Sequence, residues 1–244
     1  IKNKDDFLRG TPYLIGQLWS IKYDIIVDVR TDGLAYLLRG KKKYTKLFAS
    51  SYGEHAVEDL MGVIYAVHEN DPIPDTVIWL SDQERENAQK KLSIFLEKDK
   101  LLAICVGDIR RPVKCWTADK FIKLLNNQND KFSGVIFTGG DLDAERTEEV
   151  ASKIKLPHIN TISSSLLETA AFLEKAIIYI GPDSGVGHIA SAVKTPTISF
   201  FSVDKPERCR PWGKPVVCLK GAHNDARNIS IESVNSAIQE ILNE

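Results

Sequence analysis

The chain has 244 residues, 43% of them hydrophobic, which is enough for one large or two medium hydrophobic cores. Its 32 basic and 33 acidic side chains give a net charge of −1, which argues against nucleic acid as a partner because nucleic-acid modules carry a clear basic excess. No apolar stretch approaches the roughly 20 residues of a membrane span. The four cysteines show no CxxC spacing, so we expect reduced thiols and a cytoplasmic protein.

The first residues predict a partial α/β domain. Residues 4–22 have an amphipathic helical pattern that Gly10-Thr11-Pro12 interrupts, and Tyr23–Asp28 is an apolar run expected to form a short buried strand. A short helix follows from Leu34. Residues 39–46 then carry five positive charges, for which we expect a solvated loop. The alternative is a patch that faces an anionic membrane surface or an anionic acceptor.

Helical spacing returns at residues 55–68 and again, in a strongly charged stretch, at residues 82–97. A break rich in proline separates the two helices at residues 71–75. We expect the domain boundary after the second helix. The predicted division is therefore a first domain over residues 1–97, a second domain over residues 98–228 and a C-terminal helix over residues 229–244.

From residue 101 onward, strands and helices alternate regularly. The predicted strands are 101–106, 134–138, 160–162, 176–180 and 196–201, and the predicted helices are 117–125, 143–154, 165–174, 185–194 and 230–242. The longer strands are continuous apolar runs, which is typical of parallel strands covered by helices on both faces. The order predicts a doubly wound, Rossmann-like parallel sheet.

The most informative stretch is residues 176–201, which reads as strand, loop, helix and strand. Ligands of such sheets bind beyond the carboxyl ends of the strands, where this stretch places Asp183, Ser184, Gly185, Gly187 and His188. A helix that begins with glycines and a serine offers backbone N–H groups to an anion, so we expect a phosphate or pyrophosphate. Asp183 would cap the helix or accept from a sugar hydroxyl. The alternative is an ordinary capped turn without a ligand, with His188 packed against the preceding loop.

Two further loops fall at the same edge of the predicted sheet. Residues 107–116 contain Arg110, Arg111 and Lys114, and such cations neutralise phosphate and stabilise a leaving group that gains charge. Residues 139–143 begin with Gly139-Gly140, which lets a ligand approach the backbone, and end in Asp143, which suits a ribose hydroxyl. With the polar loop at 202–213, four loops on one rim favour a nucleotide site.

The sequence contains no dinucleotide fingerprint, phosphate-binding loop or zinc spacing. Asp141 and Asp143 do form an Asp-x-Asp pair, which some sugar transferases use to hold a divalent metal. Acids are favoured in the first turn of a helix in any case, so we expect neither a metal nor a cofactor here.

At these residues the sequence resembles glycosyltransferase family 9, the bacterial lipopolysaccharide heptosyltransferases. The family's Asp-Ser/Thr-Gly-x-x-His stretch, its Thr/Arg-Pro pair and its downstream acid, proline and arginine are matched by Asp183-Ser184-Gly185, His188, Thr195-Pro196, Asp204, Pro206 and Arg208, with Lys205 inserted. Its Lys-x-Trp-Pro is matched by Lys114-Cys115-Trp116, with Thr117 in place of proline. Its Gly-Gly turn is followed by Asp143, where glutamate is commoner.

The resemblance implies a GT-B fold of two Rossmann-like domains with parallel sheets, the first of them incomplete, in which the second domain holds a nucleotide-sugar donor. It implies ADP-heptose as the donor, the inner core of lipopolysaccharide as the acceptor, and transfer without a metal. It places Lys114 at the donor phosphate, Asp143 at the ribose, and Ser184, Gly185 and His188 at the pyrophosphate. Together with the loops, it leads us to assign catalytic roles to Lys114 and Asp183 and donor binding to Arg111, Lys114, Gly139, Gly140, Asp143, Ser184, Gly185, Gly187 and His188.

The acceptor side carries one departure from the family. Family members begin with a strand and a Gly-Asp loop whose aspartate serves as the expected general base. Nothing in this sequence corresponds to that loop, and Asp28 and Asp32 are poor substitutes, so the base is unassigned. Arg30 and Asp32 are the acceptor-side candidates. We expect a heptosyltransferase at the inner face of the membrane; the alternatives are a non-catalytic nucleotide-sugar-binding module and a sugar epimerase of GT-B shape.

Overall fold

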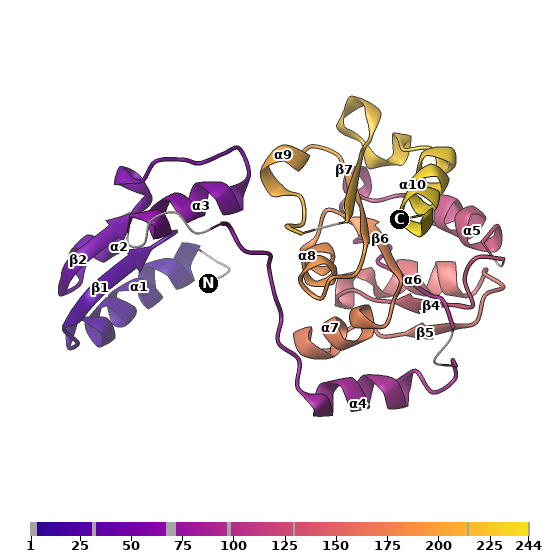
Figure 1. Cartoon of the computed structure of the whole chain (residues 1–244), viewed down its shortest axis with the longest axis horizontal. Helices are drawn as coiled ribbons and strands as arrows, with labels where there is room; N and C mark the ends of the chain where they lie inside the picture. Colours follow the sequence, from indigo (N-terminus) through magenta and orange to yellow (C-terminus); the bar gives the residue numbers. More distant parts are fainter. Residues whose placement is uncertain are drawn as a thin grey trace. The chain divides into compact units, whose positions relative to one another are not determined.

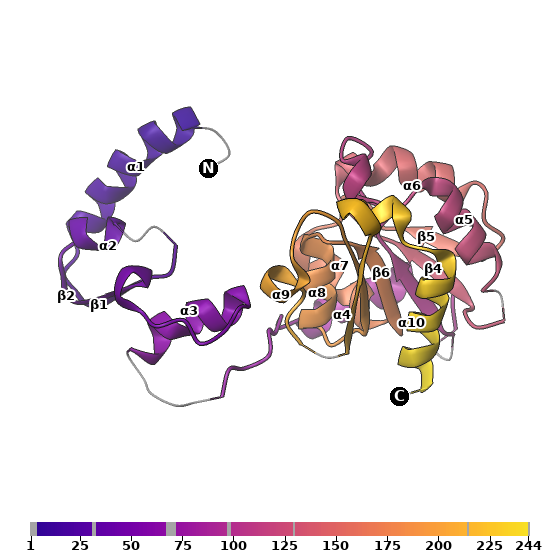
Figure 2. The same ribbon diagram turned by 90° about the horizontal axis from the view of Figure 1, so that it is seen from above.

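The computed structural model describes residues 4–30, 33–66, 72–96, 99–128, 130–213 and 215–243. The chain divides into two compact units, residues 1–74 and residues 75–244. Figures 1 and 2 show the elements of each unit along the colour bar. Among the described residues, no helix has the length and apolar character to cross a membrane.

The first unit contains a parallel pair of strands with helices. Its elements are α1 (Lys4–Trp19), β1 (Tyr23–Asp28), α2 (Leu34–Leu37), β2 (Gly40–Thr45), a 3-10 turn (Lys46–Phe48) and α3 (Ala56–Tyr65). Strand β1 forms as predicted, but the prediction that it is buried is wrong. Ile25 and Val27 are 47% and 40% exposed, because a sheet of two strands does not cover them.

The basic run forms strand β2, so the prediction of a solvated loop is wrong. The strand pairs with β1 through backbone atoms, which requires nothing of the side chains. The lysines find local partners: Lys41 forms an exposed ion pair with Asp24 at 2.6 Å, and Lys43 donates to the Tyr36 carbonyl at 3.2 Å. The charge of the run is thus partly neutralised within the unit.

Helix α3 begins where the sequence predicts and has a complete capping box. The His55 ring accepts from the Val57 N–H at 3.2 Å, and the Glu58 carboxylate accepts from the His55 N–H at 2.9 Å. The helix ends at Tyr65, with Ala66 as its C-cap. The last residues of the predicted helix, 67–68, lie outside the described residues.

The second unit is a doubly wound α/β domain, as predicted. Its strands are β3 (Leu101–Ile104), β4 (Gly134–Phe137), β5 (His158–Asn160), β6 (Ile178–Pro182), β7 (Thr197–Phe201) and β8 (Val216–Lys220). All neighbouring strands are parallel, and the order is β5-β4-β3-β6-β7-β8. This is the order of a dinucleotide-binding sheet. The sequence analysis missed β8, whose residues are only partly buried.

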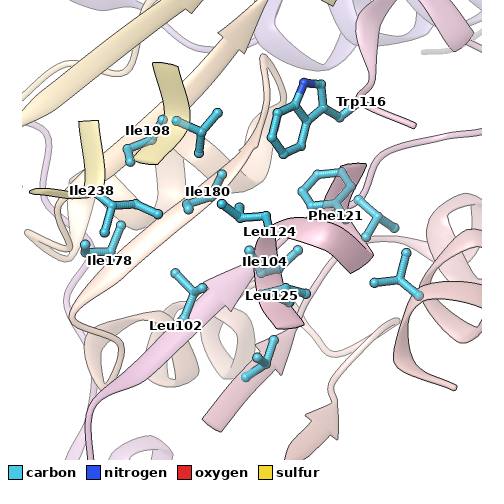
Figure 3. Packing of buried hydrophobic residues seen from close by; sticks show 14 of the residues in the cluster. Leu102, Ile104, Trp116, Phe121, Leu124, Leu125, Ile178, Ile180, Ile198 and Ile238 are labelled. Atoms are coloured by element: carbon cyan, nitrogen blue, oxygen red, sulfur yellow. The ribbon is translucent and has the colours of Figure 1, made fainter. Parts of the chain in front are cut away.

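Helices cover both faces of this sheet (Figure 2). They are α4 (Asp82–Lys91), α5 (Ala118–Asn126), α6 (Ala144–Ala151), α7 (Leu166–Glu174), α8 (Gly185–Ala192) and α10 (Ile231–Asn243); the short helix α9 (Pro206–Cys209) lies in the loop after β7 and has no buried residue. One hydrophobic cluster joins the sheet to α5, α6 and α10, and a second joins it to α4, α7 and α8. Strand β3 contributes to both clusters, because successive side chains of a strand point to opposite faces of the sheet. Leu102 and Ile104 belong to the first cluster (Figure 3), and Ala103 belongs to the second.

The division between the units falls after Pro74, whereas the sequence analysis places it after residue 97. The reason is α4, which packs against α7. Ala88 is buried in the second cluster, Arg85 pairs with Glu174 at 2.8 Å, and Lys91 pairs with Glu168 at 2.9 Å. Helix α10 also belongs to the second unit, because Val234 and Ile238 are fully buried against the sheet.

Candidate functional site

A cavity opens where the strand order of the second unit reverses. From β3 the chain continues through β4 and β5 on one side, and from β6 it continues through β7 and β8 on the other. The loops that follow β3 and β6 therefore diverge, and ligands of such sheets bind in the crevice between them. A cavity of about 810 Å³ lies there, lined by the loops after β3, β4 and β6 and by the start of α7.

Most of the predicted donor-site residues meet in this cavity. Its lining includes Arg111, Lys114, Gly139, Gly140, Asp143, Asp183, Ser184 and Gly185. Gly187 is instead buried in α8, where a Cβ atom would lie 3.5 Å from the Tyr179 ring. His188 is exposed and outside the lining. Neither Gly187 nor His188 is therefore part of the cavity lining.

The two acceptor-side candidates belong to the first unit. Arg30 is exposed, and its backbone N–H donates to the Asp28 carboxylate at 3.1 Å. The same carboxylate accepts from the Ala35 N–H at 3.3 Å, so Asp28 holds the turn that follows β1. Asp32 lies outside the described residues.

Helix α8 begins with bare backbone at the cavity. Its N-cap residue is Ser184, whose side chain makes no capping hydrogen bond. A Cβ atom on Gly185 would meet nothing within 4 Å, so the backbone is open to the cavity at this position. The N–H groups of a first helical turn have no partners within the helix, and the positive dipole end lies beside them. This arrangement suits a phosphate group.

The loop after β4 presents a carboxylate beneath a glycine turn. The Gly140 N–H donates to Asp143 at 2.8 Å, and a side chain at Gly139 would collide with that carboxylate. Burial raises the pKa of Asp143. A carboxylate has room for further donors, so Asp143 retains the capacity to accept from a sugar hydroxyl in the cavity.

The loop after β3 carries two arginines, Arg110 and Arg111, and Arg110 is hydrogen-bonded to an acidic residue of the same loop. Arg110 donates to the Asp108 carboxylate through its backbone N–H at 2.9 Å and its guanidinium at 2.8–3.2 Å. These hydrogen bonds lower the pKa of Asp108 to about 2, so the pair is ionised at neutral pH. Asp108 was not among the predicted residues. Arg110, Arg111 and Lys114 all line the cavity, and Arg110 shares its charge there with Asp108.

Lys114 is held from two sides. It ends a 3-10 turn (Pro112–Lys114), and two residues later the fully buried Trp116 packs between Phe121 and Phe200, with ring centroids 5.4 and 5.0 Å away (Figure 3 shows Trp116 and Phe121). Its ammonium group forms an ion pair with Asp204 from the loop after β7. The backbone anchor and the ion pair together fix the cation at the cavity wall.

Asp183 lies at the end of β6, close to this ion pair. It is half-buried, and burial raises its pKa, while the nearby Lys114 opposes the rise and Asp204 adds to it. The pKa of Asp204 is lowered, chiefly by its hydrogen bond from Lys114. The sequence analysis placed Asp204 in a family motif but assigned it no role, because nothing in a sequence pairs it with a lysine 90 residues away.

Apolar side chains form the remaining wall. Leu142, Leu166, Val186 and Ile189 line the cavity, and the first two are 52% and 58% exposed. The sequence analysis missed them, because they resemble ordinary helix residues. A flat apolar group such as a nucleobase suits this wall, beside the acid for a sugar and the cations for phosphate.

The Asp-x-Asp pair has local partners. The Asp141 carboxylate accepts from the Ser163 hydroxyl, and Asp143 accepts from Gly140. Within the described part of the chain, no three His, Cys, Asp or Glu side chains gather in a group that could hold a metal. The four cysteines are free thiols, of which Cys105 and Cys115 are buried beside the cavity.

Comparison with known proteins identifies the family of the chain. Residues 32–238 match the sequence family described as glycosyltransferase family 9 (heptosyltransferase). Lipopolysaccharide heptosyltransferase 3 of Escherichia coli strain K12 is 30% identical over 236 residues, which cover 87% of this chain and 68% of that protein.

Solved structures share the fold. The glycosyl transferase family 9 protein of Veillonella parvula superposes with a TM-score of 0.85 at 18% identity, over 99% of this chain and 80% of its own. An E. coli heptosyltransferase solved with ADP superposes with a TM-score of 0.71 at 18% identity, over 96% of this chain and 78% of its own. The predicted GT-B fold class is therefore confirmed. The chain belongs to glycosyltransferase family 9.

Proposed function

We propose that this chain transfers a heptose from ADP-heptose to the inner core of lipopolysaccharide. The observation that carries the proposal is the cavity at the strand-order reversal. It combines a cation (Lys114), a bare helix start (Gly185), a carboxylate for a ribose hydroxyl (Asp143) and an apolar wall for a base. A nucleoside diphosphate has a group for each of these: its base for the apolar wall, its ribose for Asp143, and its two phosphates for Lys114 and the start of α8.

The printed descriptions of relatives support ADP as the nucleotide. The E. coli heptosyltransferase of the same fold was solved with ADP, and a second structure of it holds an ADP-2-deoxy-2-fluoro heptose. The E. coli relative at 30% identity is a lipopolysaccharide heptosyltransferase. Family membership makes the same chemistry the natural proposal for this chain.

The reaction breaks the bond between the sugar C1 atom and the diphosphate oxygen and forms a bond from C1 to an acceptor hydroxyl oxygen. The electron pair of the broken bond goes to the diphosphate. Lys114 and the first N–H groups of α8 stabilise this growing charge. Asp143 accepts from the ribose and orients the donor. The acceptor hydroxyl gives its proton to a general base, which is unassigned; Asp28 holds the turn after β1 through the Arg30 and Ala35 N–H groups.

We also propose that transfer needs no divalent metal, because Lys114 and the helix start supply positive charge at the leaving diphosphate. The protein would act on the cytoplasmic side of the membrane, with exposed lysines of β2 such as Lys42 meeting anionic lipid. Reversal of Lys41 and Lys42 to Glu should weaken binding to vesicles that contain anionic lipid, and unchanged binding would remove this part of the proposal.

The test is a transfer assay with the purified chain, ADP-heptose and a lipopolysaccharide inner-core acceptor, run with and without a chelator. We expect ADP release together with a gain of one heptose in the mass of the acceptor, in both conditions, and loss of both signals in Lys114→Met. ADP release with no mass gain would contradict transfer. Dependence on added metal would contradict only the metal-free part.

A further inference from the structure

The cavity contains an ion pair that a bound donor would disturb. Lys114 lines the cavity. Its partner Asp204, in the loop after β7, is not part of the lining. Both side chains retain partial exposure, 29% for Lys114 and 42% for Asp204. An anion in the cavity would therefore compete with Asp204 for the same ammonium group.

Asp204 has a second carboxyl group beside it. Asp183 lines the cavity and lies near enough to Asp204 for each carboxyl to shift the pKa of the other, so three ionisable groups from the loops after β3, β6 and β7 are coupled. Other titratable groups that interact with these carboxyls include Lys220 and Cys218 on β8 and Cys209 on α9, and Arg208 lies beside Cys209. Lys114 forms its ion pair with Asp204.

We propose that Asp204 is a positioning residue that holds Lys114 before the donor binds and releases it to the donor diphosphate, and that the Asp183–Asp204 carboxyl pair then takes up one proton. This inference rests on the proposed function, since it needs a diphosphate in the cavity. It adds a proton-linked exchange of partners to donor binding.

The proton follows from the charges. Before the donor binds, Lys114 lowers the pKa of Asp204, while burial raises that of Asp183. When Lys114 turns to phosphate, two neighbouring carboxyls lose their cation, and repulsion between their charges favours the form in which one of them is protonated. One proton from solvent forms an O–H bond within the pair. When the nucleotide leaves, Lys114 returns to Asp204 and the proton goes back to solvent.

The experiment is calorimetric titration of the full chain with ADP, at several values between pH 6 and 8, in buffers of different ionisation enthalpy. The dependence of the measured heat on the buffer gives the number of protons taken up. Asp204→Asn is the test variant. Glu149→Gln is its matched control, because Glu149 is a similarly exposed carboxylate in an ion pair, with Lys153, outside the cavity lining.

On binding ADP, the wild type and Glu149→Gln should each take up more protons than Asp204→Asn, by as much as one proton per site. Any proton exchange by ADP itself is common to all three proteins and cancels in this difference. We expect Asp204→Asn to bind ADP about three- to fivefold more tightly, the size of an exposed ion pair. Because binding takes up a proton, the ADP affinity of the wild type should rise relative to that variant as the pH falls. Asp204→Glu, which keeps a carboxylate, should retain the proton uptake.

Equal proton numbers in the wild type and Asp204→Asn, or equal or weaker ADP binding by the variant, would overturn the inference and leave the nucleotide site intact. A purely structural ion pair would give weaker binding, the opposite sign. If Asp204→Asn does not fold, the test compares proton uptake on ADP binding by the wild type and by Asp204→Glu. If neither protein takes up a proton, the inference is overturned. Failure of the wild type to bind ADP would overturn the proposed function as well.

Discussion

The indole N–H of Trp116 donates to the backbone carbonyl of Ile229 across 2.9 Å. This hydrogen bond connects the loop that carries Lys114 to the segment that precedes α10. Lys120 donates to the same carbonyl at 2.7 Å, so the carbonyl keeps one partner if the indole is removed. The position of Lys114 at the cavity therefore depends on a fully buried ring in the largest core cluster.

Trp116→Phe should destabilise the second unit by about 1–2 kcal/mol, because the smaller ring leaves a cavity and loses the hydrogen bond. Trp79→Phe is the matched control, since Trp79 is 85% exposed and its replacement should cost less than about 0.5 kcal/mol. Chemical denaturation of both variants measures the difference. Equal losses in the two variants would show that Trp116 does not anchor the loop.

Gly185→Ala should separate stability from binding. Because a Cβ atom at this position meets nothing within 4 Å, the variant should fold normally and gain up to about 1 kcal/mol from reduced freedom of the unfolded chain. The same methyl group points into the space that a diphosphate needs, so ADP affinity should fall about tenfold. Gly16→Ala in α1 is the control, with equally open space and no place in the cavity lining. Unchanged ADP affinity in Gly185→Ala would place the phosphate elsewhere.

Asp143→Asn should weaken ADP binding about tenfold, because an amide is a poorer acceptor than a carboxylate for ribose hydroxyls. The loss should disappear when the ligand is 2′,3′-dideoxy-ADP, which lacks those hydroxyls. Glu149→Gln, at an acid of α6 outside the cavity lining, should leave both affinities unchanged. An equal loss with both ligands would mean that Asp143 acts through the loop and not through the ribose.

Asp143 should also make stability depend on pH. Burial raises its pKa, so the folded protein holds this proton at pH values where the unfolded chain has released it. Wild-type stability should therefore decline, relative to Asp143→Asn, as the pH rises from about 4 through the raised pKa. The variant should be the more stable protein at pH 7, and the gap should narrow on acidification. Denaturation curves at pH 4.5 and pH 7 test this, and a gap that widens in acid would contradict it.

The second unit could be predicted from the sequence because its strands bury both faces. Residues 101–106 and 176–180 are unbroken apolar runs, and each becomes a central strand of the sheet. The carboxyl ends of such strands share one edge, so loops distant in the sequence were expected together, and the cavity lining confirms this for Lys114, Asp143 and Gly185.

The sequence analysis missed strands β2 and β8 and assigned helix α4 to the wrong unit. Strand β2 contains three lysines in succession, and strand β8 is only partly buried, yet both form through backbone pairing. Helix α4 was predicted, but its strongly charged sequence does not indicate that Ala88 lies in the core of the second unit.

The polar pairs of the site were also beyond prediction. The capture of Arg110 by Asp108 depends on the turn of one loop, and the pairing of Lys114 with Asp204 depends on how the loops after β3 and β7 approach each other. His188 and Gly187 follow the family motif in sequence, but the rotation of α8 keeps both out of the cavity lining.

The most direct test of the account is calorimetric titration of the chain with ADP, UDP and GDP, repeated with Lys114→Met. The account predicts one site per chain, a preference for ADP, and at least tenfold weaker ADP binding in the variant, because Lys114 is a cation on the cavity wall. Binding of ADP that is indifferent to Lys114, or no binding of any of the three nucleotides, would contradict a diphosphate site at the strand-order reversal.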